Sequence, residues 1–287
     1  MACDWLLIDG SSLIFRAFYG IPAASALAPD GRPVNAVRGF LDSLGRLITQ
    51  RRPHHLAVAS DEDWRPDWRV ALIPEYKAHR VAEPTPPGLV RQLPVIHELL
   101  AAVGVDMQGL AGYEAEDVIA TWSALAPGAI EVRSGDRDLV ALVEDPRVRV
   151  LYPERTGLAV IDEAEVTRRY GIPGRRYADF AVLRGDPSDG LPGVKGVGAR
   201  TAADLILRHG RIEDMLDQAR FSDSDREYLR RAVRVVRPIL DLPVTLPAGC
   251  RDRYPVDPAG LAGLAAENGV AGPCGRLVAA LSTLAEP

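Results

Sequence analysis

Cysteine is scarce in this sequence, and long apolar runs are missing from it. The 287 residues include three cysteines, Cys3, Cys250 and Cys274, which are odd in number and show no paired spacing. This excludes a disulfide framework and a cysteine-based zinc site, and it fits a reducing cytoplasm. No run approaches the roughly twenty apolar residues of a membrane span, and acidic residues interrupt the apolar N-terminus. We therefore predict a cytoplasmic protein with no membrane segment and no export signal.

An overall excess of positive charge is also lacking, although a local excess is present. The net charge is −5, whereas residues 191–237 hold ten Lys and Arg against seven Asp and Glu, which leaves −8 for the rest of the chain. A hydrophobic fraction of 47% allows a large core, in one elaborated domain or in a large domain with a smaller companion. Contact with a polyanion is thus expected only on a local basic surface.

Three short segments with strand patterns each lead into an aspartate. The segments are residues 5–8, 56–60 and 130–134, and the aspartates that follow are Asp9, Asp61 and Asp136. Such segments are typical of buried parallel strands, and helical patterns lie between them. The alternation predicts a doubly wound, mostly parallel α/β sheet with a ligand crevice beyond the carboxyl ends of its strands. We therefore expect the three aspartates to converge in that crevice.

Six further carboxylates are candidates for the same crevice. They are Glu114, Glu116, Asp117, Asp138, Asp186 and Asp189. The first three open a predicted helix at 114–125, where the helix dipole alone would account for one or two of them. For Asp186 and Asp189 an ordinary turn is the alternative. Nine carboxylates in one crevice would repel one another strongly, and divalent cations bound between them would relieve that repulsion.

Residues 185–202 join the last two of these acids to a glycine-rich turn. The run from Gly193 to Gly198, Gly-Val-Lys-Gly-Val-Gly, predicts a tight turn that opens a helix whose N–H groups face a nucleic-acid backbone. This pattern alone is weak, and it also occurs in glycosylases and junction-binding proteins. A helix predicted at 225–237 sets four arginines on one side, either as a DNA-facing surface or as an ordinary solvated face. These arginines are Arg226, Arg230, Arg234 and Arg237.

Residues 62–87 interrupt the alternation of strands and helices. The segment is polar, longer than an ordinary connection and rich in basic and aromatic residues, and long connections of this kind are often functional or mobile. A solvated lid of balanced charge is the alternative. Further helices are predicted at 35–50, 89–103, 162–170, 175–183 and 259–284, and further strands at 105–108, 148–152 and 158–161.

Together these motifs resemble the 5′-nuclease family, which comprises the N-terminal domain of bacterial DNA polymerase I and the related flap endonucleases. The resemblance runs from about residue 5 to residue 246. It rests on six ordered matches: Leu7-Ile-Asp-Gly-Ser-Ser12 with Arg16-Ala-Phe18; Asp61; Tyr76-Lys-x-x-Arg80; Gly112-Tyr-Glu-Ala-Glu-Asp117; Gly135-Asp-Arg-Asp-Leu139; and Gly185-Asp-x-Ser-Asp189 with Leu191-Pro-Gly-Val-Lys-Gly-Val-Gly198.

The resemblance implies an acidic site for two divalent cations, Mg²⁺ or Mn²⁺, with a third ion as an alternative. It places Asp9, Asp61, Glu114 and Glu116 around one ion, Asp138, Asp186 and Asp189 around the other, and Asp136 near both, with Asp117 beside them. Lys77 and Arg80 would lie in a helical arch and offset charge on the scissile phosphate. With Asp136 they are the expected catalytic residues. The family often binds a monovalent cation at its helix-hairpin-helix unit, so K⁺ is expected there.

Contacts with DNA are expected in three places. Arg16, with Phe18 and Tyr19, is a candidate for the branch point through charge and base stacking. The arch and the helix-hairpin-helix unit supply the others: Arg69, Tyr76, Gly193, Lys195, Gly196, Gly198, Arg200, Thr201, Arg230 and Arg234. The expected domains are a PIN-like α/β nuclease domain at 1–170 with the arch at about 62–90, a helix-hairpin-helix region at 171–245, and a helical segment at 246–287 packed on the same body.

Three positions depart from the family pattern. Glu116 stands where bacterial members usually have Asp. Eukaryotic and archaeal flap endonucleases carry Glu at this place, so we expect altered metal spacing and retained activity. Ser60 replaces the usual Phe, and Gly190 replaces the usual Asn. Both changes are expected to soften the positions of the neighbouring ligands.

The activity that the sequence predicts is metal-dependent hydrolysis of branched or 5′-recessed DNA by a monomer, as a 5′-3′ exonuclease and 5′ flap endonuclease of replication and repair. Three rival activities are a junction-binding protein without catalysis, a base-excision glycosylase and a single-strand RNase. The full acidic set argues against the first, the α/β pattern against the second, and the hairpin and arch against the third. No protein partner can be inferred from the sequence.

Overall fold

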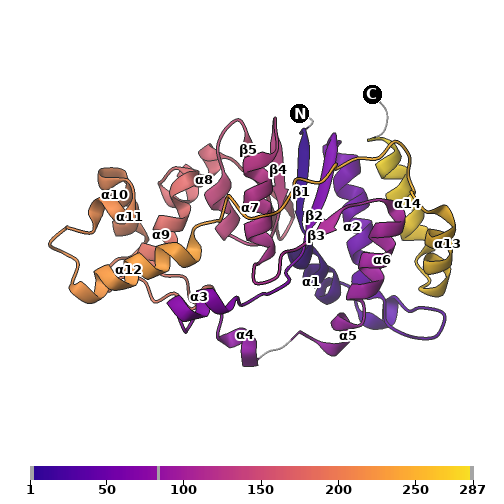
Figure 1. Cartoon of the computed structure of the whole chain (residues 1–287), viewed down its shortest axis with the longest axis horizontal. Coiled ribbons are helices and arrows are strands. Elements are labelled where there is room, and N and C mark those ends of the chain that lie inside the picture. Colours follow the sequence, from indigo (N-terminus) through magenta and orange to yellow (C-terminus); the bar gives the residue numbers. More distant parts are fainter. Residues whose placement is uncertain (1–2, 83–84, 285–287) are drawn as a thin grey trace.

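The centre of the molecule is a six-stranded sheet with strand order β3-β2-β1-β4-β5-β6 (Figure 1). The computed structural model describes residues 3–82 and 85–284, apart from the side chain of Ala82. The strands are β1 (Trp5–Asp9), β2 (His55–Ala59), β3 (Met107–Gln108), β4 (Ile130–Arg133), β5 (Val148–Glu154) and β6 (Gly157–Ile161). Neighbouring strands from β3 to β5 are parallel, and β6 is antiparallel to β5. The predicted α/β class with a mostly parallel sheet is confirmed.

Helices cover both faces of this sheet and extend beyond it at both ends (Figure 1). In chain order they are α1 (Gly10–Gly20), η1 (Ala23–Ser25), α2 (Asn35–Arg51), α3 (Asp67–Leu72), α4 (His79–Ala82), α5 (Pro87–Val90), α6 (Leu93–Val103), α7 (Ala115–Leu125), η2 (Asp138–Leu142), α8 (Glu163–Tyr170), η3 (Gly174–Arg176), α9 (Tyr177–Arg184), η4 (Pro187–Asp189), α10 (Ala199–His209), α11 (Ile212–Met215), α12 (Asp223–Val236), α13 (Pro258–Glu267) and α14 (Ala271–Ser282). The η elements are short 3₁₀ helices.

Strand β1 shows why two helical layers are needed. All five of its residues are buried, and its side chains alternate between the two faces of the sheet. Leu6 and Ile8 pack in a core with α1, α2, α6 and α14, whereas Trp5 and Leu7 pack in a second core with α7 and α9. A strand that is apolar on both faces can be buried only in the middle of such a sheet. This position brings the carboxyl end of β1 to the point where the strand order reverses, between β1 and β4.

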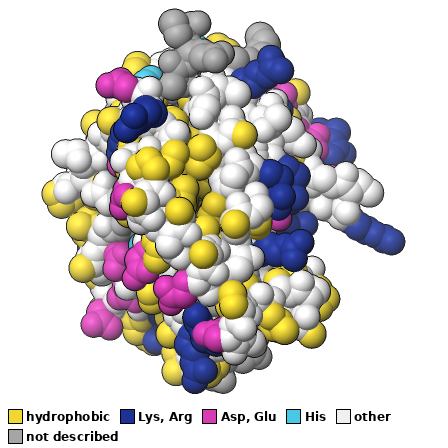
Figure 2. Space-filling view, turned by 90° about the vertical axis from the view of Figure 1, so that its right-hand side faces the viewer, with side chains coloured by type: hydrophobic (Ala, Val, Ile, Leu, Met, Phe, Trp, Pro, Cys, Tyr) yellow, Lys and Arg dark blue, Asp and Glu magenta, His cyan; other side chains and the backbone are white. Residues whose placement is uncertain are grey.

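The two ends of the molecule are formed by different helices. Helices α9 to α12 project from one side of the sheet, and α13 and α14 pack at the other, beside α2 and α6 (Figure 1). The face at that second end carries acidic side chains on one side, Lys and Arg on the other, and hydrophobic side chains between them (Figure 2). Within the described residues, none of the helices has the length and apolar character required to cross a membrane.

Two predicted helices are each divided in the structure. The helix expected at 89–103 consists of α5 and α6 separated by a turn, because Pro94 fits only near the start of a helix. The segment expected at 259–284 consists of α13 and α14, because Gly269 adopts φ +65° between them. The segment expected at 62–90 to form an arch contains the short helices α3, α4 and α5, and residues 83–84 lie outside the described part.

Candidate metal-binding active site

The aspartates at the strand ends do converge, and serine side chains orient them. Asp9 caps α1 by accepting the Ser12 N–H at 2.9 Å, and its other oxygen accepts the Ser134 hydroxyl. The same Ser134 oxygen accepts the Asp136 N–H at 2.8 Å, and an Asp136 oxygen accepts the Asp138 N–H at 2.9 Å. Asp9 and the loop after β4 are therefore held together by one continuous hydrogen-bonded network.

Asp61 joins this group from β2. Its N–H donates to the Ser11 hydroxyl at 3.0 Å, and its carboxylate accepts the Ala115 N–H of α7 at 2.8 Å. Sequence reasoning did not assign roles to Ser11, Ser12 and Ser134. The available signal was their position two or three residues from Asp9 or Asp136, where a serine N–H or hydroxyl can hydrogen-bond to the strand-end segments.

Helix α7 brings a second set of acids to the same place. One oxygen from each of Glu116, Asp136 and Asp138 lies within 4.8 Å of the other two, which is close enough for a shared cation. One oxygen of Glu116 pairs with Arg69 at 3.1 Å, and the other is buried and has no hydrogen-bond partner among the residues that the structure describes. We call Asp9, Asp61, Glu116, Asp136, Asp138 and Asp189 the carboxylate cluster.

Burial and mutual repulsion raise the pKa of most acids in the carboxylate cluster. Burial, then the neighbouring Asp61, raises the pKa of Asp9 to about 7. Burial raises the pKa of Asp138 well above its ordinary value, and Asp136, Asp189 and Glu116 raise it further. The pKa of Glu116 also lies well above its ordinary value because of burial, despite the lowering effect of Arg69 and Lys77. The protein alone does not supply enough positive charge to this cluster.

Divalent cations fit this shortage of charge. The donors are carboxylate oxygens, which Mg²⁺ and Mn²⁺ prefer, and one of the donor residues, Glu116, has a buried oxygen without a partner among the described residues. The residues best placed to hold such ions are Asp9, Asp61, Glu116, Asp136, Asp138 and Asp189. Their assignment to individual ions stays a prediction.

Three basic or hydroxyl side chains from the segment after β2 are buried against Glu114. Arg69 and Tyr76 donate to one oxygen of Glu114, and Lys77 donates to the other. Arg69 also donates to Asp117 at 2.8 Å and to the Val235 carbonyl of α12 at 3.1 Å. Glu114 is therefore fully occupied by protein donors, so its expected role as a direct metal ligand does not fit this conformation.

The burial of these residues corrects further expectations. Arg69 and Tyr76 are 0% and 2% exposed, so their side chains do not face DNA as expected. They tie the segment 65–77 to α7 and α12 and supply buried donors to the acids. Asp117 is 0% exposed, completes the capping box of α7 with Glu114, and pairs with Arg69. It is a positioning residue in this structure and not the metal ligand that we expected.

Lys77 lies at the junction of two acidic segments. Its N–H donates to the Asp189 carbonyl at 3.1 Å, and its ammonium group pairs with Glu114. The backbone of Lys77 has φ +46°, a left-handed conformation that is uncommon for a residue with a side chain and is often found at functional sites. Arg80, the other expected catalytic cation, is partly exposed in α4. The catalytic roles of both cations stay predictions.

The acids of the loop after α9 divide into two environments. Burial, and then the neighbouring Asp136, raises the pKa of Asp189 although Lys77 lowers it, so Asp189 belongs to the carboxylate cluster. Asp186 instead accepts the Ser188 N–H at 3.0 Å and pairs at 3.3 Å with both Arg137 and Arg184. Asp186 thus already has nearby positive charge, which makes direct metal binding less favourable for it than for Asp189.

The departure at Gly190 has a structural reason. Gly190 has φ +72°, and a Cβ atom there would lie 2.0 Å from the Glu75 carbonyl oxygen. This close approach allows the segment of Tyr76 and Lys77 to reach the Asp189 carbonyl. Gly190 therefore tightens the contact, contrary to the expectation that it softens the ligand position. The other replaced residue, Ser60, is buried and donates to Glu62 at 3.3 Å.

The glycine-rich turn is joined directly to the acidic loop but faces solvent. Asp186 and Leu191 exchange backbone hydrogen bonds at 3.1 and 2.9 Å, and Val194 and Val197 anchor the turn in the core. Gly196 has φ +77° with open space around it, and Gly198 is the N-cap of α10. We call Gly193, Lys195, Gly196, Gly198, Arg200 and Thr201 the hairpin surface; Gly193 and Thr201 are half-buried, and the other four are exposed.

Of the four arginines expected on α12 to face DNA, two remain available. Arg230 and Arg234 are exposed and form no ion pair among the described residues. Arg226 donates to the Leu216 carbonyl at 2.8 Å and pairs with Asp223, and Arg237, just after α12, pairs with Asp179 and Glu213. The basic surface of α12 that is free to contact DNA therefore consists of Arg230 and Arg234.

The candidate branch-point residues lie on α1. Arg16 is exposed, Tyr19 is 70% exposed, and Phe18 packs edge-on against the Tyr19 ring. Arg16 and Tyr19 border a groove of about 1060 Å³ that Arg46, Arg51 and Arg133 also line. Arg133 is 3% exposed, and one of its guanidinium nitrogens lacks a hydrogen-bond partner among the described residues. The groove is suited to an anion.

Comparisons with known proteins agree with this geometry. Residues 4–171 match the family described as 5′-3′ exonuclease, N-terminal resolvase-like domain, and residues 172–242 match 5′-3′ exonuclease, C-terminal SAM fold. A 5′-3′ exonuclease of Streptomyces coelicolor is 47% identical over 301 residues, which cover 96% of this chain and 100% of that protein. A 5′-3′ exonuclease of Mycobacterium tuberculosis is 48% identical over 323 residues, which cover 99% of each chain.

The fold is also similar to that of a solved structure. This is the bacteriophage T5 D15 flap endonuclease in a complex with DNA and metal ions, with a TM-score of 0.64, 18% identity and 99% of each chain covered. At this identity the likeness concerns the arrangement of the elements.

Proposed function

The chain belongs to the 5′-3′ exonuclease family, and on this premise we propose that it is a metal-dependent 5′ nuclease acting on branched or 5′-recessed DNA. One observation carries the proposal: acids from three strand ends, from α7 and from the loop after α9 meet at the point where the strand order reverses. Arg69 pairs with Glu116 at 3.1 Å, and Lys77 lies nearby, yet the pKa values of Asp9, Glu116 and Asp138 stay raised, so these cations do not balance the charge of the cluster.

The residues of the chain divide the work of phosphodiester hydrolysis among them. The carboxylate cluster would hold two divalent cations, which when bound lower the pKa of the attacking water and neutralise charge on the leaving 3′ oxygen. Ser12 and Ser134 fix the Asp9 carboxylate and Ser11 fixes the backbone of Asp61 before the substrate arrives, and Arg69 and Lys77 keep Glu114 from adding further repulsion. Lys77 and Arg80 are proposed to offset charge on the scissile phosphate.

DNA would approach along the side on which the exposed basic groups lie. The hairpin surface offers backbone N–H groups at the start of α10, and Lys195 and Arg200 are exposed beside them. Arg230 and Arg234 add positive charge from α12, and Arg16 and Tyr19 border the groove beside α1. The similar T5 enzyme is described in complex with DNA and metal ions, which supports the same substrate class here.

The proposal also covers the identity of the ions, the oligomeric state and the location of the protein. We propose Mg²⁺ or Mn²⁺ as the cluster ions, K⁺ at the hairpin surface, a monomer in solution and a cytoplasmic location. The three cysteines are free thiols, which fits a reducing compartment. A junction-binding protein would not need the carboxylate cluster, so its arrangement favours catalysis over binding alone.

The direct test uses end-labelled flap, nicked, single-stranded and RNA substrates of equal length, each with Mg²⁺ and with EDTA. We expect Mg²⁺-dependent cleavage of the flap and nicked DNA that leaves a 5′-phosphate, and much slower cleavage of the single strand and the RNA. Tight flap binding with no cleavage, with Mg²⁺ or with EDTA, would support the junction-binding alternative. Preferred cleavage of the RNA would support the RNase alternative.

A further inference from the structure

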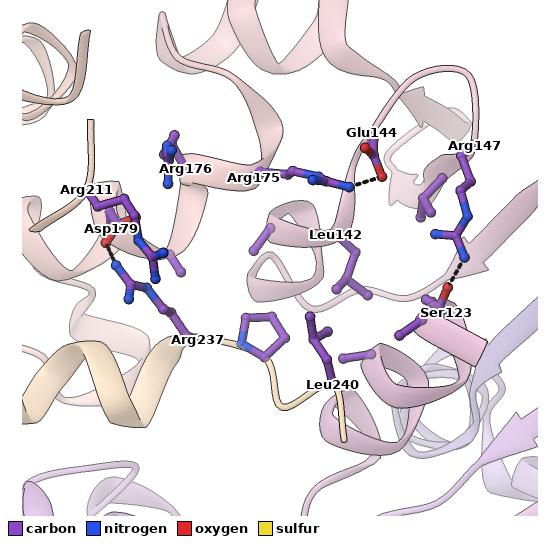
Figure 3. Close-up of a pocket in the computed structure, with 16 residues that line it drawn as sticks. Ser123, Leu142, Glu144, Arg147, Arg175, Arg176, Asp179, Arg211, Arg237 and Leu240 are labelled. Carbon is purple, nitrogen blue, oxygen red and sulfur yellow. Dashed lines mark hydrogen bonds and ion pairs between the residues drawn. The ribbon is translucent and has the colours of Figure 1, made fainter. Parts of the chain in front are cut away.

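A second concave site lies away from the carboxylate cluster. It has a volume of about 420 Å³, within the roughly 300–1,000 Å³ typical of small-molecule sites. Its walls come from the C-terminal half of α7, the segment from η2 to β5, the segment from η3 to α9, Arg211 before α11, and the chain that follows α12. Figure 3 shows Leu142 and Leu240 across its floor, with arginines on two opposite sides. We call it the arginine pocket.

The arginine pocket keeps positive charge in a chain that is acidic overall. Its five arginines are Arg147, Arg175, Arg176, Arg211 and Arg237. The acids Glu144, Asp179 and Glu213 pair with Arg175, Arg211 and Arg237, so five positive charges face three negative ones and two remain. Arg176 is partly exposed and forms no ion pair within the described part of the chain. Arginine side chains of this kind suit phosphate groups because their planar guanidinium donors can bind two oxygens at once.

The rest of the lining suits an apolar body with a few polar groups. Leu240 is 53% exposed although it borders the pocket, together with Pro238, Leu142 and Ala124. Ser123 is 3% exposed, and its hydroxyl has no hydrogen-bond partner among the described residues. A buried hydroxyl without a partner is costly, and a ligand in this pocket could supply one. Beside it, Arg147 donates to the carbonyls of Ser123 and Ala126 and so fixes the C-terminal end of α7.

Helix α7 and the 3₁₀ helix η2 contribute to both the arginine pocket and the carboxylate cluster, but at opposite ends of each helix. Helix α7 carries Glu116 in its first turn and Ser123 near its end, and seven residues of helix span roughly 10 Å. The 3₁₀ helix η2 likewise begins with Asp138 of the cluster and ends with Leu142 of the pocket. A ligand in the pocket would therefore not occupy the place of the scissile phosphate.

We propose that the arginine pocket binds a small organic phosphate of the nucleoside 5′-monophosphate class. Its phosphate would bind Arg176 with Arg175 and Arg211, and its base and sugar would cover Leu142, Leu240 and Pro238 within reach of the Ser123 hydroxyl. The choice of a nucleotide among organic phosphates rests on the proposed function, because such nucleotides are the mononucleotide products of a 5′ exonuclease. The site itself rests on the geometry alone.

The test measures binding of deoxyadenosine 5′-monophosphate to the full chain by calorimetry in EDTA, where the carboxylate cluster repels a phosphate. We expect one site per chain, weaker binding of inorganic phosphate, and weaker binding of deoxyadenosine. Arg176→Gln should weaken nucleotide binding about tenfold or more, as loss of a charged hydrogen-bond donor does. Ala124→Trp, which places a large ring in the pocket from an exposed position, should abolish it. The matched control Arg155→Gln removes an exposed arginine outside the pocket and should leave binding unchanged.

Three outcomes would overturn this proposal. They are the absence of nucleotide binding at millimolar concentration, binding that neither pocket variant weakens, and an acidic peptide that binds the pocket more tightly than the nucleotide does. Flap cleavage separates this test from that of the proposed function. Both pocket variants should cleave flap DNA at the parent rate. If the parent chain binds the nucleotide but cleaves no DNA, the pocket assignment stands and the proposed nuclease function fails.

Discussion

The chain has only two lysines, and they occupy opposite surroundings. Lys77 is 2% exposed, has a left-handed backbone and pairs with Glu114 beside the carboxylate cluster. Lys195 is exposed on the hairpin surface. The first region is closed, acidic and fixed by hydrogen bonds from four segments, whereas the second is open, basic and anchored in the core by two valines.

The difference shows how one chain can separate chemistry from affinity. A reacting phosphate requires fixed positions for charge, so the surrounding groups are buried and bonded to one another. A duplex backbone requires only charge and accessible N–H groups, so the hairpin surface can remain solvated. The short run from Asp186 to Gly198 joins the two regions by a backbone bridge between Asp186 and Leu191. Changes in the first region should affect rate, and changes in the second should affect binding.

The largest effect is expected for Asp136→Ala. Asp136 lies with Glu116 and Asp138 where a cation would be shared, so its loss should reduce cleavage below detection in single-turnover assays. Binding of flap DNA in Ca²⁺ or EDTA should stay the same or strengthen slightly, because a negative charge is removed. Asp241→Ala, on the connector after α12, is the control and should cleave normally. Near-normal turnover of the Asp136 variant would remove it from the site.

The next effect concerns the backbone of the hairpin surface. Gly196 has φ +77° with open space around it, so Gly196→Val introduces backbone strain and no collision. Left-handed backbone costs roughly 1–2 kcal/mol for residues with a side chain, which corresponds to about a tenfold loss of affinity for a duplex-bearing flap. Gly31→Val is the matched control, since Gly31 also has positive φ and open surroundings. Equal losses of affinity in the two variants would show a general effect on folding.

A third prediction concerns the stability of the metal-free protein. An acid whose pKa is raised by folding stabilises the folded state below its unfolded pKa, and this stability is lost as pH rises through the folded pKa. For Asp9 the window runs from 3.8 to about 7. The thermal unfolding midpoint in EDTA should therefore fall by several degrees as pH rises across this window. Mg²⁺ should raise the midpoint more near pH 7 than near pH 4. Asp9→Asn should reduce the fall, and a midpoint independent of both pH and Mg²⁺ would contradict the repulsion.

The smallest effect is expected for the exposed arginines of α12. If both contact phosphate, replacing Arg230 and Arg234 with Gln should lower the slope of log affinity against log salt by up to about two. Cleavage at saturating enzyme should not change. The control replaces Arg155 and Arg253, which are also exposed but lie outside α10 to α12. An unchanged slope in the α12 variant would identify its arginines as an ordinary solvated face.

The sequence was sufficient for the elements whose signal is local. Short strand-like segments that lead into Asp9, Asp61 and Asp136 located three parallel strands and the edge at which their acids meet. The breaks between α5 and α6 and between α13 and α14 also have local signals in the sequence, because Pro94 and Gly269 each interrupt a helical pattern.

The remaining differences depend on packing between distant segments. Arg69 and Tyr76 looked like surface residues because their partners, Glu114 and the Val235 carbonyl, lie 38 or more positions away in the chain. The occupied oxygens of Glu114, the pairing of Asp186 with two arginines and the need for Gly190 next to Glu75 have the same origin. Residue type and spacing identify candidate ligands, but only the fold shows which of them are already bonded.

The most direct test of the separation between chemistry and affinity compares Lys77→Ala with Lys195→Ala. Both variants remove one lysine, and single-turnover cleavage of a 5′ flap is measured over a range of enzyme concentrations with Mg²⁺. We expect Lys77→Ala to lower the saturated rate on the order of 10²–10³-fold with little change in the half-saturating concentration. Lys195→Ala should raise the half-saturating concentration and reach the parent rate at saturation. Equal changes in both variants, or a Lys77→Ala rate that recovers fully at saturation, would contradict the account.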